Sequence, residues 1–109
     1  MGSRRSAREM ALQVLFQHEY TPVASVPESI EAVKNHFRTD NETVHYAEEI
    51  TTGVLSHLSE IDAIIQQSST HWKLHRMARV DLSIIRLAVF EMKLKSPQLP
   101  PTVAINEAI

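Results

Sequence analysis

The 109-residue sequence contains no cysteine and only two glycines. Without cysteine the chain cannot form disulfides, thiolate zinc sites or cysteine nucleophiles. GxGxxG needs three glycines, and Gly2 and Gly53 lie too far apart for GxxxxGK(S/T), so neither phosphate-binding loop can form. The longest apolar run, from Leu87 to Phe90, is far shorter than the roughly 20 residues that cross a bilayer, and no charged-then-apolar leader opens the chain. These absences exclude most enzyme classes and favour a cytoplasmic protein.

Charge is distributed unevenly along the chain. Hydrophobic residues make up 43% and charged residues 22%, a composition typical of globular proteins. The length of 109 residues suits one domain, which we expect to span residues 1–109. The formal net charge of −2 combines +1 in residues 1–20, −6 in residues 21–62 and +4 in residues 63–95, with Glu107 beyond them. Any contact with nucleic acid must therefore be local, in one of the two basic regions.

The apolar residues recur every three or four positions, which predicts helices and no strand. We expect a first helix that ends near Tyr20, a second capped by Ser25, a third from about Thr43 to Leu58, a fourth that starts at Ile61, a fifth from Val80 or Asp81 to Leu94, and the start of a sixth at residues 103–109. The stripe of the first helix consists of Ala7, Met10, Ala11, Val14, Leu15 and His18. The predicted fold class is an all-α bundle of six helical segments.

Three features of the C-terminal half carry further expectations. Trp72 is expected to anchor a corner before the fifth helix, and the proline-rich stretch at residues 96–101 to form a loop. Arg86 lies within the most apolar helix, so we expect it to pair with an acid or to extend its charge to solvent. The last helix has only about two turns of sequence, so we expect a fragment with low stability, exposed apolar surface or self-association.

Catalytic and metal sites receive little support from the sequence. His71 and His75 are four residues apart, but no third ligand is near, so we expect no metal site. No serine lies in a GxSxG frame, and we expect no catalytic residue.

Two basic stretches remain as candidate contacts. Lys73, Arg76 and Arg79 would form one stripe on a helix, although solvated residues that cover the end of the bundle are the favoured interpretation. Arg4, Arg5 and Arg8 begin the chain with no acid before Glu9, and their guanidinium groups suit phosphate oxygens and unpaired bases. The alternative for these arginines is a frayed, well-solvated terminus.

Four stretches of the chain, in order, resemble the NusB family of bacterial transcription antitermination factors. They are Arg-Arg-Ser-Ala-Arg-Glu at residues 4–9, the Trp72 corner with Arg76-Met77, the apolar helix at residues 80–92, and Val-Ala-Ile-Asn-Glu-Ala-Ile at residues 103–109. Members of the family continue this last helix and add another, and neither segment is present here. The resemblance implies a pair of small helix bundles, the second of them incomplete in this chain.

The resemblance also implies a function and partners. Family members bind the boxA element of ribosomal-RNA leader transcripts as a heterodimer with NusE, a small-subunit ribosomal protein, and join other Nus factors on the RNA polymerase elongation complex. By this resemblance Arg4, Arg5 and Arg8 would bind RNA. Gln13, about one turn further on, could read a base edge, with core packing or exposure to solvent as the favoured alternative. Asp81 is a candidate for the NusE contact, with capping of the helix dipole as its alternative. No cofactor or catalysis is implied, and the free protein could be a monomer or a homodimer.

Two other functions fit the same residues. The chain resembles the RNA-binding domain that precedes some ribosomal-RNA cytosine methyltransferases, which would require a methyltransferase domain downstream. A helical module that binds only proteins is the second alternative, and comparison of boxA RNA with a scrambled strand would separate it from an RNA-binding factor.

Overall fold

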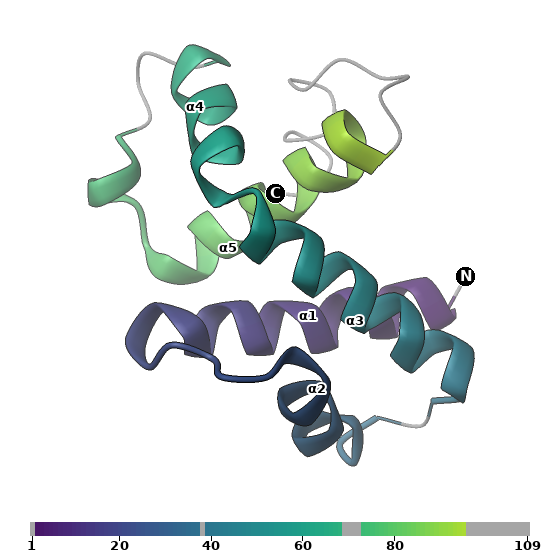
Figure 1. Cartoon of the computed structure of the whole chain (residues 1–109). Helices are drawn as coiled ribbons and strands as arrows, with labels where there is room; N and C mark the ends of the chain where they lie inside the picture. The colour runs from purple at the N-terminus through teal and green to yellow at the C-terminus, as the bar shows by residue number, and fades with distance from the viewer. Residues whose placement is uncertain (1, 38, 69–72, 96–109) are drawn as a thin grey trace. The chain divides into compact units, whose positions relative to one another are not determined.

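The structure is a computed structural model that describes residues 2–37, 39–68 and 73–95. Over these residues the chain is helical and contains no strand, which confirms the all-α fold class. The elements in chain order are α1 (Gly2–Tyr20), α2 (Val26–Lys34), α3 (Asn41–Ser56), α4 (Leu58–Ser68), a 3-10 helix η1 (Leu74–Arg76), α5 (Arg79–Val89) and a π-helical segment η2 (Phe90–Lys95) (Figure 1). They belong to two compact units, Met1–Thr52 and Gly53–Ile109.

Helix α1 buries the apolar stripe that the sequence predicts. The buried members of the stripe are Ala7, Met10, Ala11, Val14 and Leu15. Their spacing of three and four places them on one side of the helix, which leaves the other side for polar residues. His18, the last member of the predicted stripe, is half-buried, and its Nδ1 accepts a hydrogen bond from the backbone N–H of Val23 at 3.0 Å. This bond ties the loop after α1 to the end of the helix.

Helix α2 begins as the sequence predicts. Ser25 has extended backbone angles and caps the helix, and its Oγ accepts from the backbone N–H of Glu28 at 3.4 Å. Pro27 lies in the first turn, where a missing N–H costs nothing because it would have no partner within the helix. The helix ends at Lys34.

The third and fourth helices meet earlier in the chain than we expected. Helix α3 begins at Asn41 rather than Thr43 and ends at Ser56, so Leu58 opens α4 instead of closing α3. His57 alone separates the two helices: its N–H bonds the carbonyl of Val54 in a tightened last turn, and its own carbonyl accepts from Ile61. A break of one residue barely disturbs the apolar period, so the periodicity misplaces this boundary.

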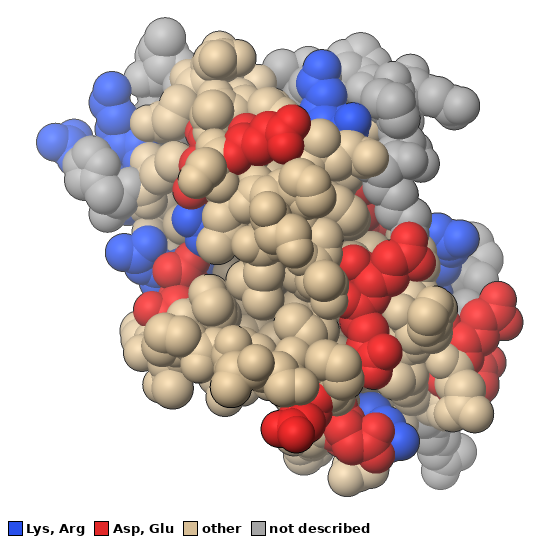
Figure 2. Space-filling view, viewed as in Figure 1, with Lys and Arg blue, Asp and Glu red and all other residues tan. Residues whose placement is uncertain are grey.

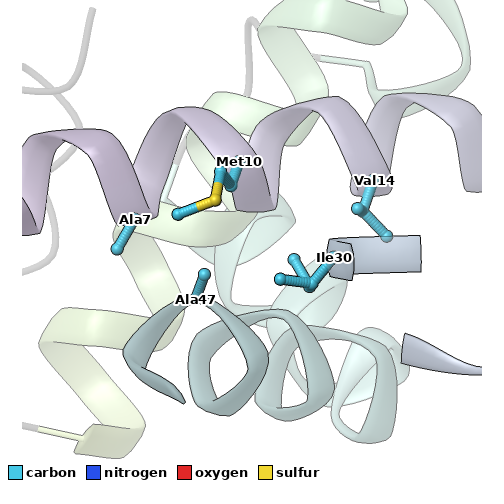
Figure 3. Packing of buried hydrophobic residues seen from close by; sticks show 5 residues of the cluster. All are labelled: Ala7, Met10, Val14, Ile30 and Ala47. Carbon is cyan, nitrogen blue, oxygen red and sulfur yellow. The ribbon is translucent and has the colours of Figure 1, made fainter. Parts of the chain in front are cut away.

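The core of the first unit forms where α1, α2 and the first part of α3 meet. Its buried cluster consists of Ala7, Met10, Val14, Ile30 and Ala47. In Figure 3 the three side chains of α1 point toward Ile30 of α2 and Ala47 of α3. Partly buried side chains surround the cluster, among them Phe37, Val44 and Tyr46. This packing holds the N-terminal turns of α1 close to the beginning of α3.

In the second unit α5 packs against α4. Ile61 and Ile65 are buried on α4, and Leu82 and Ile85 are buried on α5. Arg86 pairs with Asp62 of α4 through two bonds of 2.9 Å, from Nε to Oδ1 and from Nη2 to Oδ2. The expectation that Arg86 pairs with an acid is confirmed.

The fifth helix differs from the expected single α-helix that ends at Leu94. It begins at Arg79, its α-helical part ends at Val89, and residues 90–95 continue as a π-helix. A wider turn shifts the faces of the helix only gradually, so the apolar pattern does not distinguish the two forms. The Trp72 corner, the loop at residues 96–101 and the last helix at residues 103–109 lie outside the described residues. Over the described parts, no helix has the length and apolar character that a membrane span requires.

Candidate nucleic-acid interface

The first three turns of α1 carry the arginines that the sequence singles out. Arg4, Arg5 and Arg8 are all exposed. The Arg5 side chain is 84% exposed, and its Nε lies 3.4 Å from Glu9 Oε1 in an ion pair that is itself open to solvent. Exposed pairs of this kind contribute roughly 0–1 kcal/mol, so a phosphate can displace the carboxylate at little cost. The arginines are therefore presented to solvent as an RNA contact needs, and their role in binding stays a prediction.

Arg4 makes a contact that the sequence did not reveal. Its guanidinium carbon lies 4.4 Å from the centre of the Tyr46 ring of α3, within the range of a cation–π interaction. The two residues are 42 positions apart, so no spacing rule links them. Tyr46 is one of the side chains packed on the core of the first unit, and it therefore gives the Arg4 guanidinium a fixed surface.

A hollow of about 240 Å³ lies beside this pair. Arg4 lines it from α1, and all its other lining residues come from α3 or its N-cap, including Tyr46 and three acids. The acids are Asp40, Glu42 and Glu49. The hollow therefore combines one guanidinium, one tyrosine ring, the imidazole of His45 and three carboxylates.

Asp40 has a structural task at the edge of this hollow. Its Oδ1 accepts a hydrogen bond of 2.8 Å from the backbone N–H of Thr43 in the first turn of α3. Hydrogen bonds from the backbone and side chain of Thr43 hold the pKa of the Asp40 carboxyl below its ordinary value. The carboxylate therefore stays charged at neutral pH and caps the helix.

Gln13 lies further along α1 and is exposed. Arg5, Glu9 and Gln13 are spaced by four and share one side of the helix. Two aromatic residues that the sequence analysis did not single out continue this side toward the end of α1. Phe16 and Tyr20 pack edge to face with ring centres 5.2 Å apart, and Tyr20 is 67% exposed.

The second basic stretch does not form the single helical stripe that we considered. Lys73 precedes η1, Arg76 ends it, and Arg79 starts α5, so the three belong to different local structures. All three are exposed. Asp81 lies in the first turn of α5, where Ala78 supplies no side-chain cap, so its carboxylate is placed to complement the helix dipole. Its contact with NusE stays a prediction.

Among the described residues, no group of three or more histidine or carboxylate side chains could hold a metal ion, and His71 lies outside them.

Charge on the surface is mixed. On the face shown in Figure 2, acidic and basic side chains lie in small patches among uncharged ones, and neither sign covers the face. On this face, any RNA contact would have to be local.

Comparison with known proteins supports the resemblance. The model of the NusB family matches residues 5–109. The transcription antitermination protein NusB of Bdellovibrio bacteriovorus is 46% identical over 109 residues, which cover all of this chain and 79% of that protein. The protein of the same name from Myxococcus xanthus is 42% identical over 113 residues, with the same two coverages. A third, from Desulfatibacillum aliphaticivorans, is 41% identical and covered to 75%.

No solved structure matches the chain significantly. The family match and the full-length similarity to these relatives agree with the motifs at residues 4–9 and 80–92 and with the helical fold. The chain belongs to the NusB family, and its function is transcription antitermination.

Proposed function

We propose that the chain serves antitermination by binding the boxA element of ribosomal-RNA leader transcripts as a heterodimer with NusE. The observation that carries this proposal is the exposure of Arg4, Arg5 and Arg8 together at the start of a helix whose apolar stripe is packed into a core. The complex would join other Nus factors on the RNA polymerase elongation complex, in the bacterial cytoplasm where transcription takes place.

Binding, rather than chemistry on the RNA, is the task that these residues suit. Guanidinium groups donate paired hydrogen bonds to phosphate oxygens and stack on unpaired bases. The packed side of α1 fixes the helix, so the arginine backbone is already ordered before RNA arrives and less entropy is lost on binding. Gln13, on the same side as Arg5, is placed to donate to or accept from a base edge.

A basic protein partner suits the acidic part of the chain. Residues 21–62 carry a net charge of −6, and Asp81 adds an exposed carboxylate at the start of α5. Joining NusE to this chain would place two RNA-binding surfaces in one particle, which raises affinity beyond that of either protein alone. In the absence of NusE, pairing of two copies into a homodimer is the second assembly we propose to test.

The methyltransferase alternative receives less support than the free factor. The matched relatives are named antitermination proteins, and this chain spans three quarters or more of each of the three described above. The alternative of a module that binds only proteins does not require exposed arginines at the start of α1.

A titration of boxA RNA tests the proposal. Fluorescently labelled boxA RNA and a scrambled strand of equal composition are titrated with the chain, alone and with NusE present. We expect tighter binding to boxA, and a further gain with NusE. Equal affinity for both strands with NusE present would show that the chain does not recognise boxA.

Replacement of Arg4, Arg5 and Arg8 by alanine together tests the interface. Each phosphate contact on a single strand contributes about 0.7 to the slope of log K against log salt, so we expect the slope to flatten by up to about 2. The matched control replaces Lys34, Lys93 and Lys95, which changes the net charge equally but lies outside both basic stretches. Equal effects of the two triple variants would move the RNA contact away from α1.

A further inference from the structure

The hollow beside Arg4 is built differently from a phosphate site. The guanidinium of Arg4 lies over the ring of Tyr46, 4.4 Å from its centre, and Arg4 is exposed. Tyr46 is itself held against the core of the first unit. The stack thus offers a flat, prepared surface at the N-terminal end of α1.

The carboxylates of the hollow decide which ligand fits that surface. Asp40, Glu42 and Glu49 outnumber the one arginine, so a phosphate brought into the hollow would meet net repulsion. Carboxylates accept hydrogen bonds, and the N–H groups on the Watson–Crick edge of a base are suitable donors. The volume of 240 Å³ is below the roughly 300–1,000 Å³ typical of pockets for drug-sized ligands, and it suits a single flat ring system.

We propose that this hollow holds one unpaired guanine base of the bound RNA, stacked on Arg4 with its imino and amino N–H groups donated to the carboxylates. This inference rests on the proposed RNA-binding function and assigns different roles to the three arginines. Arg5 and Arg8 contact phosphates, and Arg4 stacks on a base. Guanine is favoured because it presents two adjacent donors on one edge, which a single carboxylate accepts as a pair.

A basic side chain from a protein partner is the other ligand that carboxylates attract. Arg4 argues against it, because its fixed positive charge already covers the Tyr46 ring that would otherwise receive an incoming cation. A neutral base meets no such repulsion and gains from stacking on the guanidinium.

The test measures base preference as well as affinity. Uridine oligomers that contain one central guanosine, one inosine or no purine are titrated with the full chain. We expect the guanosine oligomer to bind about tenfold more tightly than the all-uridine one, with inosine between them because it lacks the amino group. Equal affinity for the three oligomers would overturn the proposal.

Variants of the residues that line the hollow locate the preference. Arg4→Lys keeps the charge but loses the flat stacking surface, so we expect the tenfold preference to fall to about twofold while the salt slope stays the same. The matched control is Arg5→Lys on the same helix, which should retain the preference. Glu42→Gln combined with Glu49→Gln should also reduce the preference, without weakening binding of the all-uridine oligomer. Tyr46→Phe keeps the ring and should keep the preference.

The outcomes separate this inference from the function on which it rests. If the preference survives Arg4→Lys and the double glutamine variant, the hollow does not read a base, although RNA binding that depends on the three arginines would still stand. If a tetra-arginine peptide displaces no RNA but binds the chain with a dependence on Glu42 and Glu49, the hollow is a protein contact and the proposal is wrong. If the wild-type chain binds none of the RNA oligomers, the proposed function itself is wrong.

Discussion

Asp40 shows how a single carboxylate couples helix stability to pH. It accepts a hydrogen bond from the Thr43 N–H and thereby satisfies one of the backbone donors that begin α3. Its folded-state pKa is lowered, so it stabilises the fold at pH values above its ordinary pKa of 3.8, and this contribution disappears as the pH falls through the lower, folded-state value.

We therefore expect Asp40→Ala to lower the melting temperature at pH 7. The difference from the wild type should shrink as the pH falls below 3.8 and through the lower folded-state pKa of Asp40, where the wild-type carboxyl becomes protonated. Circular dichroism melts between pH 7 and pH 2.5 measure it, with Asp40→Asn as the control that keeps a capping oxygen. A difference that stays constant over this range would show that the charge of Asp40 is not involved.

Arg86 and Asp62 form an ion pair between α5 and α4. The sequence predicted that Arg86 pairs with an acid but did not identify Asp62 as that acid. Both side chains are mostly shielded, at 15% and 27% exposure, and the two bonds are parallel. Because removal of one partner leaves a partly buried charge without its paired acceptor, Asp62→Ala should lower the free energy of unfolding by about 1–3 kcal/mol. Denaturant unfolding measures the change.

The control for this pair is Glu31→Ala, which removes an exposed pair with Lys34 on one helix. A change within about 0.5 kcal/mol is expected there, since exposed pairs contribute little. Equal effects of the two substitutions would mean that shielding adds nothing to the Arg86 pair.

At the scale of the helices, the periodicity of apolar residues predicted which helices form, but it did not fix where each of them ends. The stripe of α1 and the cap of α2 were both correct, because each depends on residues within a few positions of one another. The boundary at His57 and the π-helical end of α5 were missed, because hydrogen bonds select them and the spacing of apolar residues does not. Both features lie in the second unit, where Gly53 is also found.

Gly53 accounts for a close approach of two elements. It lies in α3, and a Cβ there would fall inside contact distance of three atoms of the Phe90 ring, which is 8% exposed. Alanine favours a helix over glycine by about 1 kcal/mol, whereas overpacking costs roughly 1–3 kcal/mol, so Gly53→Ala should destabilise the fold overall.

Denaturant unfolding of Gly53→Ala tests this contact. Combining it with Phe90→Leu, which removes part of the ring, should restore some of the loss. Thr52→Ala on the exposed side of the same helix should be close to neutral. A Gly53→Ala variant more stable than wild type would show that the ring moves aside at no cost.

For the whole molecule, the balance of charge bears on the proposed RNA binding. The formal charge is −2, so the chain as a whole has no electrostatic attraction to a polyanion. Residues 1–20 carry a net +1 and residues 21–62 a net −6, so attraction to RNA is confined to local basic contacts.

The sequence alone determined the helical class, the buried face of α1, the capped start of α2 and the family, because periodicity, caps and motifs are properties of neighbouring residues. It also indicated the arginines at residues 4, 5 and 8 as candidates, from their charge and position. Only the tertiary structure brought Arg4 to Tyr46, Arg86 to Asp62 and Phe90 to Gly53. These pairs are 42, 24 and 37 residues apart in the chain, and packing of the core decides which distant side chains meet.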